Sequence, residues 1–160
     1  MESRRVLLAD ASATHELGRQ LAETWLRSGD AAAPLLLLEG NLGAGKTSLV
    51  QGLAAGLGIS EPITSPSFAL AQHYSGQLAA GRRTALVHLD LYRLELPAAA
   101  DELFAQEEEE ALSLGAVMAV EWPGRLSFVP EGAWQLTLEL VDGQRPEAGR
   151  LVHIRQPGSA

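Results

Sequence analysis

The chain has 160 residues, about the length of one domain, and 46% of them are hydrophobic and 20% charged, as in ordinary globular proteins. No apolar run approaches the roughly 18 residues that a membrane span needs, and the lack of cysteine excludes disulfides and thiolate metal sites. The net charge of −8 argues against a protein that grips a nucleic-acid backbone by itself, because such binding depends on clustered lysine and arginine. No long apolar stretch follows the two arginines near the N-terminus, so we expect no signal peptide and a cytoplasmic protein.

The first part of the chain alternates between strand and helix patterns. Residues 5–9 favour a short strand, and Asp10 or Ser12 is the candidate N-cap of the helix that follows. Apolar residues recur in that helix at helical spacing, and Gly29 ends it. The apolar run 34–39 does not alternate with polar residues, which is typical of a strand covered on both faces in a parallel sheet.

A glycine-rich turn follows this strand and precedes a helix that we predict over residues 46–57. Gly40, Gly45, Lys46 and Thr47 fill every fixed position of the phosphate-binding pattern G-x-x-x-x-G-K-[ST]. Glycines let successive backbone N–H groups point at one anion, and the following helix adds the positive end of its dipole. The pattern predicts that Lys46 reaches the β- and γ-phosphates of a nucleotide and that the Thr47 hydroxyl binds Mg²⁺.

Lysine usage supports this interpretation. Lys46 is the only lysine of the chain, and the other 11 basic residues are arginine. A lysine is a compact point charge on a flexible stem, whereas an arginine is a planar fork. The pattern requires the point charge at the position where the chain has it. A chance match in a glycine-rich sequence is the weaker alternative, because a strand pattern precedes the turn and a helix pattern follows it.

The remaining elements continue the alternation of helix and strand patterns. The proline- and hydroxyl-rich stretch 59–68 predicts an exposed loop. Beyond it we predict a strand over 68–74, a hairpin-like connection over 75–83, a strand over 84–92, a helix over 97–104, a strand over 116–120, and a hairpin of strands 134–141 and 151–155. The four acids at 107–110 are interpreted as a solvated helix start. Together these patterns predict one three-layer α/β domain over residues 1–155, with a mixed, mostly parallel sheet and an antiparallel edge hairpin. Residues 156–160 are predicted to form a loose tail.

Two acids, Asp90 and Glu121, lie at the ends of apolar strands. The carboxyl ends of strands in an open α/β sheet form its ligand crevice, and the glycine-rich loop lies at the same edge. A carboxylate there can bind Mg²⁺ directly or through water, or it can polarise an attacking water. The alternative for each acid is that it merely caps a turn. Asp90, Glu121 and Lys46 are therefore the candidate catalytic residues.

Several neighbours of these acids have two interpretations. His88 points to the same face of its strand as Asp90, and a buried, hydrogen-bonded histidine is the favoured interpretation over a ligand. Trp122 can stack on a base, but packing or contact with a partner is favoured. Arg93 and Arg125 can touch phosphates, and surface ion pairs are the default interpretation.

Four stretches in fixed order resemble one family: residues 40–47, 64–68, 90–93 and 121–123. From about residue 8 to residue 125 the chain resembles the TsaE (YjeE) family, the bacterial ATPases of tRNA threonylcarbamoyladenosine synthesis. The family usually has threonine where Ser67 stands, and both residues keep a hydroxyl in a switch-like segment. The region after residue 125 matches the family poorly.

The resemblance implies a small P-loop ATPase that uses ATP and Mg²⁺ and acts with the TsaB–TsaD complex. That complex places a threonylcarbamoyl group on N6 of adenosine 37 in tRNA, and the resemblance implies that ATP hydrolysis resets the complex. The chain would therefore reach tRNA only through the complex. No membrane or DNA partner is expected. By position in the family pattern, Thr47 and Glu121 bind Mg²⁺, and Asp90 supports the metal or the water. The nucleotide-binding residues that the resemblance implies are Asn41, Leu42, Gly43, Ala44, Gly45, Lys46, Thr47, Ser48 and Arg150.

Three other functions are compatible with a phosphate-binding loop. A small-molecule kinase usually adds a lid that carries several arginines, and beyond Arg82 and Arg83 nothing in the chain resembles one. A GTPase commonly reads guanine with an Asn-Lys-x-Asp loop, which requires a lysine other than Lys46. A nucleotide-dependent adaptor overlaps the ATPase prediction, because an ATPase without a well-placed arginine finger is slow. We therefore expect binding of ATP and Mg²⁺ with weak intrinsic hydrolysis that partner proteins raise.

Overall fold

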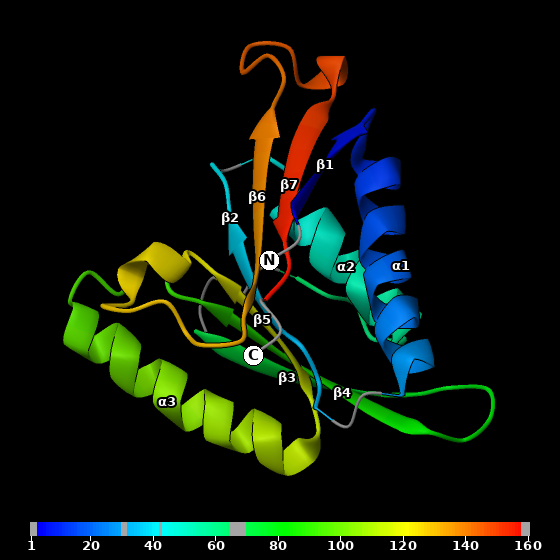
Figure 1. Ribbon diagram of the computed structural model, residues 1–160, viewed down its shortest axis with the longest axis vertical. Helices are drawn as coiled ribbons and strands as arrows, with labels where there is room; N and C mark the ends of the chain where they lie inside the picture. Colours follow the sequence, from blue (N-terminus) through cyan, green and yellow to red (C-terminus); the bar gives the residue numbers. More distant parts are fainter. Residues whose placement is uncertain (1–2, 30–31, 42, 65–69, 158–160) are drawn as a thin grey trace.

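A seven-stranded sheet organises the computed structural model, which describes residues 3–29, 32–41, 43–64 and 70–157 (Figure 1). The elements in chain order are β1 (Ser3–Leu8), α1 (Ala11–Ser28), β2 (Leu35–Glu39), α2 (Lys46–Gly56), β3 (Ala71–Gln77), β4 (Arg83–Asp90), α3 (Pro97–Leu114), β5 (Val117–Glu121), the 3₁₀ turn η1 (Pro123–Arg125), β6 (Trp134–Leu140), the 3₁₀ turn η2 (Pro146–Ala148) and β7 (Arg150–Arg155). None of the helices in these ranges combines the length and the hydrophobicity of a bilayer-spanning segment.

The order of the strands across the sheet is β1-β7-β6-β2-β5-β4-β3. β2 pairs in parallel with both β5 and β6, and β4 pairs in parallel with β5. β7 is antiparallel to both β6 and β1, and β3 is antiparallel to β4. Among the described strands only β7 and β3 therefore run against the other five. The predicted mixed, mostly parallel sheet with an antiparallel hairpin is confirmed. The hairpin of β6 and β7 was predicted at the edge of the sheet, but β1 pairs with β7 and forms that edge.

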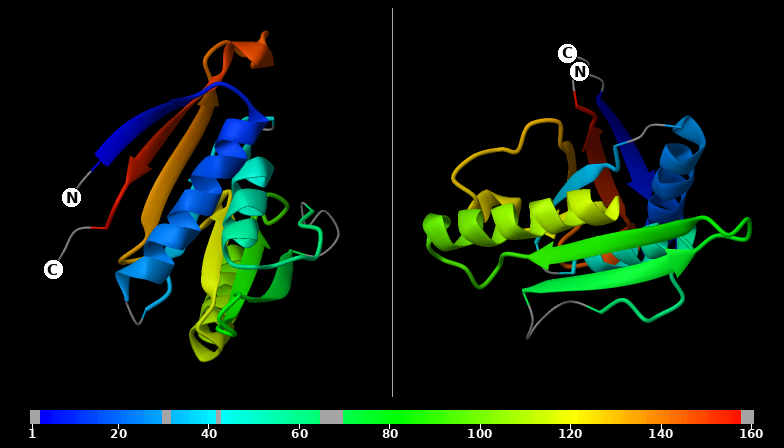
Figure 2. Two further views of the ribbon diagram at one scale, coloured as in Figure 1. Left: turned by 90° about the vertical axis from the view of Figure 1, so that its right-hand side faces the viewer. Right: turned by 90° about the horizontal axis from the view of Figure 1, so that it is seen from below.

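The helices form two layers on opposite faces of the sheet (Figure 2). α1 and α2 pack against each other on one face, where Leu53 belongs to the same buried cluster as Leu36 of β2. α3 covers the other face over β4 and β5, where Phe104 shares a buried cluster with Leu89 and Val120. The three-layer arrangement predicted from the alternation of patterns is therefore present.

β2 shows why its sequence lacks alternation. Leu36 and Leu38 belong to the core beneath α1 and α2, whereas Leu37 between them belongs to the core beneath α3. Successive residues of a strand point to opposite faces, so a strand with cover on both faces needs apolar residues throughout. The strand that feeds the glycine-rich loop is thereby held from both sides.

α1 and α2 cross closely because glycines stand at their contact. A Cβ added to Gly52 would lie 1.8 Å from the carbonyl oxygen of His15, and one added to Gly18 would lie 2.1 Å from that of Leu49. No larger residue fits at either position without a shift of the helices. This contact places α2, whose first residue is Lys46, at a defined distance from α1.

Asp10 is the residue that caps α1. Its Oδ1 accepts a hydrogen bond of 2.8 Å from the backbone N–H of Ala13. The two candidates that the sequence left open, Asp10 and Ser12, are thus distinguished, since Ser12 lies inside the helix. Gly29 ends the helix in the left-handed conformation, as predicted.

The boundaries of β3 and β4 differ from the prediction. β3 continues to Gln77, so Gly76 lies within the strand and not in the connection predicted over 75–83. The glycine serves a close approach there, because a Cβ at this position would lie 2.6 Å from the Thr84 hydroxyl oxygen. β4 ends at Asp90 and not at residue 92. The predicted start of β3 at residues 68–69 lies outside the described residues.

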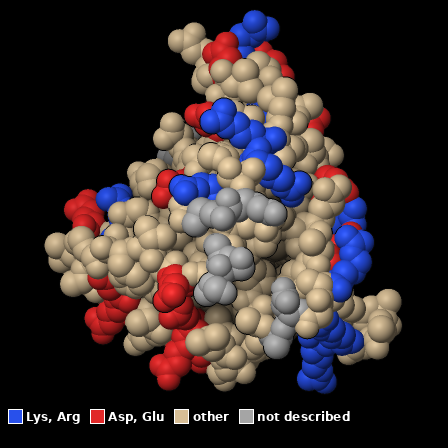
Figure 3. Space-filling view, viewed as in Figure 1, with Lys and Arg blue, Asp and Glu red and all other residues tan. Residues whose placement is uncertain are grey.

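α3 is longer than predicted, and the interpretation of residues 107–110 as a helix start is wrong. These four acids lie in the interior of a helix that continues to Leu114 and ends at Gly115, which has a left-handed φ of 64°. The apolar spacing fades after Phe104, but alanine, glutamate and leucine are good helix formers and continue the helix. Acidic side chains gather over α3 in Figure 3, and Glu107 pairs with His73 of β3 at 2.6 Å.

Candidate nucleotide-binding site

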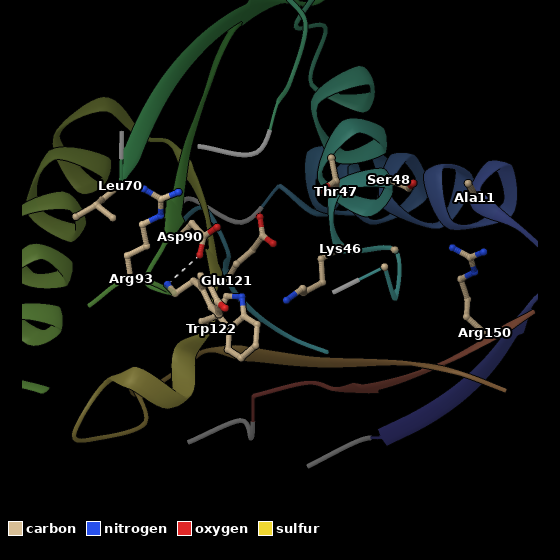
Figure 4. Close-up of a pocket in the computed structure, with 13 residues that line it drawn as sticks. Ala11, Lys46, Thr47, Ser48, Leu70, Asp90, Arg93, Glu121, Trp122 and Arg150 are labelled. Carbon is tan, nitrogen blue, oxygen red and sulfur yellow. Dashed lines mark hydrogen bonds between the residues drawn. The ribbon is translucent and has the colours of Figure 1, made fainter. Parts of the chain in front are cut away.

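A pocket of about 450 Å³ opens where α2 begins and where β4 and β5 end (Figure 4). Lys46 lines it from α2, Asp90 and Glu121 line it from the two strand ends, and Arg150 lines it from the start of β7. Asp90 and Glu121 are register partners of the parallel pair β4–β5, so both reach the same edge of the sheet. The structure therefore brings together residues that lie far apart in the sequence and that were predicted to share one site.

The acids point toward the layer that contains α2. Leu86 lies in the core beneath α1 and α2. It precedes His88 by two residues and Asp90 by four. Ala119, two residues before Glu121, lies in the same core. Because side chains two residues apart on a strand share a face, His88, Asp90 and Glu121 face the side from which α2 presents its N-terminus.

The glycine-rich loop has the backbone that its sequence predicts. Gly43 and Gly45 have φ angles of 84° and 108°, a region that residues with a side chain rarely adopt. Gly45 is also the N-cap of α2, so the positive end of that helix begins beside the pocket. A loop of this kind can direct backbone N–H groups at an anion.

The predicted nucleotide-binding residues divide into three groups. Gly43, Gly45, Lys46, Thr47, Ser48 and Arg150 line the pocket. Asn41 and Ala44 do not line it: Asn41 borders a neighbouring hollow, and Ala44 is buried in the core. The two are joined by a hydrogen bond from the N–H of Ala44 to the carbonyl oxygen of Asn41. Leu42 lies outside the described residues.

Lys46 is a buried cation without a hydrogen bond. Only 5% of its surface is exposed, and its Nζ has no hydrogen-bond partner among the described residues. Burial lowers the pKa of Lys46, and the charges of Glu121 and Asp90 act in the opposite direction. A buried ammonium is costly unless an anion or an acceptor accompanies it, so this atom indicates a binding position for an anion.

The Lys46 ammonium lies 4.4 Å from the centre of the Trp122 ring, within range of a cation–π contact. Trp122 has φ 59° and ψ 48°, and no other described residue except glycine has a positive φ. Its ring also packs against Tyr92, with centroids 4.8 Å apart. Packing, one of the two interpretations favoured for Trp122, is confirmed, but its contact with Lys46 could not be read from the sequence.

Asp90 and Glu121 have different surroundings. Burial raises the pKa of Asp90, and the nearby charge of Glu121 raises it further, whereas a 3.0 Å hydrogen bond from the Tyr92 N–H opposes the shift. Glu121 is 4% exposed, and its Oε2 lies 2.6 Å from Nε2 of His88. His88 is therefore a buried, hydrogen-bonded histidine, as the sequence analysis favoured.

Arg150 comes to the loop from the C-terminal hairpin. It is 8% exposed, and its Nη1 would lie 3.0 Å from a Cβ on Gly45, so the guanidinium lies directly beside the loop. In Figure 4 Arg150 and Arg93 lie at opposite ends of the pocket, with Lys46 between them. The pocket thus carries cations along its length and two acids near its middle.

The ion pairs expected for Arg93 and Arg125 are absent from the part of the chain that the structure describes. Arg93 instead lines the pocket. Arg125 donates a 3.0 Å hydrogen bond to the carbonyl oxygen of Tyr92 and lies 5.9 Å from the centres of the Tyr92 and Trp122 rings.

The predicted switch segment 64–68 is described only at Thr64, which is exposed; Ser65 and Ser67 lie outside the described residues.

The residues of the pocket fit a magnesium-bound phosphate better than a metal held by protein alone. The described residues contain no group of three or more histidine and acidic side chains that could hold a metal ion. Mg²⁺ usually takes one or two carboxylates and completes its coordination with water and phosphate oxygens. Glu121, Asp90 and the Thr47 hydroxyl supply oxygen atoms of that kind, and Lys46 supplies the cation for the phosphates.

A glycine-rich loop between β2 and α2, facing acids at the ends of β4 and β5, defines a P-loop-like α/β protein. The family model described as "Threonylcarbamoyl adenosine biosynthesis protein TsaE" matches residues 8–148, and the chain belongs to this family. The match extends well past residue 125, so the expectation of a poor match beyond that residue is wrong, and it ends two residues before Arg150.

Two curated relatives are similar over most of their length, and both are named tRNA threonylcarbamoyladenosine biosynthesis protein TsaE. The one from Nostoc sp. is 42% identical over 127 residues, which cover 79% of this chain and 72% of the relative. The one from Streptomyces coelicolor is 37% identical over 140 residues, which cover 87% of each chain. Among solved structures, YdiB from Bacillus subtilis matches 98% of this chain and 87% of its own with a TM-score of 0.67; at 22% identity this supports the fold alone.

Proposed function

We propose that this protein binds ATP with Mg²⁺, hydrolyses it slowly, and serves the threonylcarbamoylation of adenosine 37 in tRNA together with the TsaB–TsaD complex. The observation that carries the nucleotide part is the buried Lys46 ammonium, which has no hydrogen-bond partner among the described residues and faces two carboxylates across a pocket. Membership of the TsaE family and the names of the relatives support the modification pathway.

The residues of the pocket have distinct proposed roles. The backbone of residues 43–48 and the Lys46 ammonium hold the phosphates, and Arg150 contacts the nucleotide beside Gly45. Thr47 and Glu121 hold Mg²⁺, which when bound neutralises charge on the phosphate oxygens. Asp90 would support the metal or orient the attacking water, and its raised pKa suits a group that takes up a proton.

Weak turnover by the isolated protein follows from what lines the pocket. A well-placed arginine finger contributes about 10³–10⁵ in rate in related phosphoryl-transfer enzymes. Arg93 lines the pocket but is exposed, and in Figure 4 its guanidinium lies beyond Asp90 and away from Lys46. A partner that orders this end of the pocket would therefore raise the rate.

The net charge of −8 supports contact with tRNA through a partner complex and not through a basic surface of this chain. With Lys46 as the sole lysine, an Asn-Lys-x-Asp guanine loop is absent, so adenine is the proposed base. The proposed compartment is the cytoplasm, where tRNA is modified.

The test is phosphate release from ATP by the purified chain, alone and with purified TsaB and TsaD. We expect slow, Mg²⁺-dependent release that rises when the complex is added. Transfer of the phosphoryl group to an added sugar or nucleoside would establish the small-molecule kinase instead. Tight ATP binding with no release in either condition would establish a nucleotide-dependent adaptor.

A further inference from the structure

A buried pair of side chains lies behind the pocket. His88 belongs to β4 and Glu121 ends β5, and His88 Nε2 lies 2.6 Å from Glu121 Oε2. The side chain of His88 is 0% exposed and that of Glu121 is 5% exposed. Water therefore does not compete for this hydrogen bond, which is held between two adjacent strands of the sheet.

The register of β4 and β5 sets the geometry of the pair. Asp90 is the register partner of Glu121, and His88 is the partner of Ala119. His88 thus lies two residues farther from the pocket than Asp90, on the same face of the sheet. From that position its ring reaches diagonally to the carboxylate of Glu121, while the pocket end of Glu121 stays open.

The hydrogen bonding of His88 indicates which atom carries the proton. Its Nδ1 is buried and has no partner among the described residues. An ionised carboxylate can only accept a hydrogen bond, so its partner nitrogen must carry the proton. In a neutral ring Nδ1 then has no N–H, and no buried donor is left without an acceptor. We assign the proton to Nε2, which donates to Oε2 of Glu121. Within the described residues the Glu121 side chain has no other hydrogen bond, so its Oε1 is available to the pocket.

We propose that His88 is a positioning residue that holds Oε2 of Glu121 so that Oε1 faces the Mg²⁺–phosphate position beside Thr47. The proposal rests on the proposed function, because Glu121 acts through the metal. Carboxylates that bind metals are commonly oriented by such a hydrogen bond, and loss of the partner typically lowers metal affinity about 10- to 100-fold. A buried histidine needs a hydrogen-bond partner in any case; here the partner is an acid that also lines the pocket, so the hydrogen bond fixes an oxygen of the candidate metal ligand.

The experiment compares His88→Leu with His88→Gln. Leucine fills the space without a donor, whereas the glutamine amide extends about as far as Nε2 and can donate to Glu121. Affinity for a nonhydrolysable ATP analogue is measured by calorimetry with Mg²⁺ and with a chelator. We expect His88→Leu to weaken the Mg²⁺-dependent part of binding by about 10- to 100-fold, with metal-free binding unchanged, and His88→Gln to restore most of the loss.

His73→Leu is the matched control, because His73 also pairs with a glutamate but lies outside the pocket. It should leave Mg²⁺-dependent binding unchanged. If His88→Leu does not give a cooperative unfolding transition, His88→Asn replaces it, since this shorter amide cannot reach Glu121. Wild-type metal dependence in a folded leucine or asparagine variant overturns the positioning role, and so does equal loss with and without Mg²⁺. A wild-type chain that binds no nucleotide refutes the proposed function itself.

Discussion

At the scale of single residues, Lys46 shows how burial can mark a binding position. Its ammonium lies under the Trp122 ring, near two carboxylates, and has no hydrogen bond to any described residue. The motif identifies the residue type, and the structure adds that the group is already withdrawn from water. A buried ammonium without a hydrogen bond is unfavourable in the free protein, and a bound anion would remove this cost.

Lys46→Ala should lower ATP affinity by about 10- to 100-fold, because a hydrogen bond to a charged group is worth about 1.5–3 kcal/mol. The free protein should be as stable as the wild type or slightly more so, since an unpaired buried ammonium is removed. Calorimetric titration and thermal unfolding measure the two effects. Arg83→Ala, an exposed cation at the far end of β4, is the control. Unchanged ATP affinity in Lys46→Ala would refute the assignment of the loop.

Glu121→Ala should reduce Mg²⁺-dependent turnover more than nucleotide binding. It should also lower the free energy of unfolding by about 1–3 kcal/mol, because the buried Nε2–H of His88 loses its acceptor. Steady-state phosphate release and denaturant unfolding check the two results. Glu39→Ala is the control, since Glu39 also ends an apolar strand but is exposed and does not line the pocket. Equal activity of Glu121→Ala and wild type would remove Glu121 from the site.

At the scale of elements, the contact of α1 with α2 decides where the loop lies. α2 presents the first helical residues of the loop motif, and its position depends on Gly52 and Gly18 lying against the backbone of the other helix. The loop motif alone does not place α2 relative to the strand ends. The packing of α1 therefore contributes to the site although only Ala11 of that helix lines the pocket.

Gly52→Ala should destabilise the protein by about 1–3 kcal/mol, the usual cost of overpacking. Alanine favours a helix over glycine by about 1 kcal/mol, but a Cβ 1.8 Å from the carbonyl oxygen of His15 must displace one helix. Denaturant unfolding measures the change. The control is Gly143→Ala, where a Cβ would meet nothing within 4 Å and where we expect a change of less than about 0.5 kcal/mol. Equal stability of the two variants would contradict the close crossing.

At the scale of the whole molecule, the pocket joins parts from both ends of the chain. Ala11 comes from the start of α1, Lys46 from α2, the acids from β4 and β5, and Arg150 from β7. A ligand that contacts these elements binds only the folded chain. Binding is therefore coupled to global stability and is not confined to the loop.

A nonhydrolysable ATP analogue with Mg²⁺, at one hundred times its dissociation constant, should raise the free energy of unfolding by about 2.7 kcal/mol. Thermal unfolding with and without the analogue tests this, and Lys46→Ala should show a much smaller shift at the same concentration. Hydrogen exchange should slow both in α2 and in β7, which carries Arg150. Slowing confined to α2 would show that the hairpin does not contribute to binding.

The parts of the fold and site that the sequence predicts are those with local causes. The loop motif at residues 40–47, the leucine run of β2 and the glycine ends of helices are each determined by neighbours a few residues away. Alternation of strands and helices indicated a three-layer α/β fold for the same reason. The error at residues 107–110 came from following apolar spacing where helix propensity alone continued α3.

Sequence alone therefore determined the glycine-rich loop and the type of residue at the strand ends, because a glycine turn and a strand end are local events. Only the tertiary structure decided that Asp90 and Glu121 are register partners, that His88 holds Glu121, that Trp122 covers Lys46, and that Arg150 lies beside Gly45. The reason is the strand order: β2 lies between β5 and β6, which come much later in the chain. Which strands become neighbours depends on the packing of both helix layers at once.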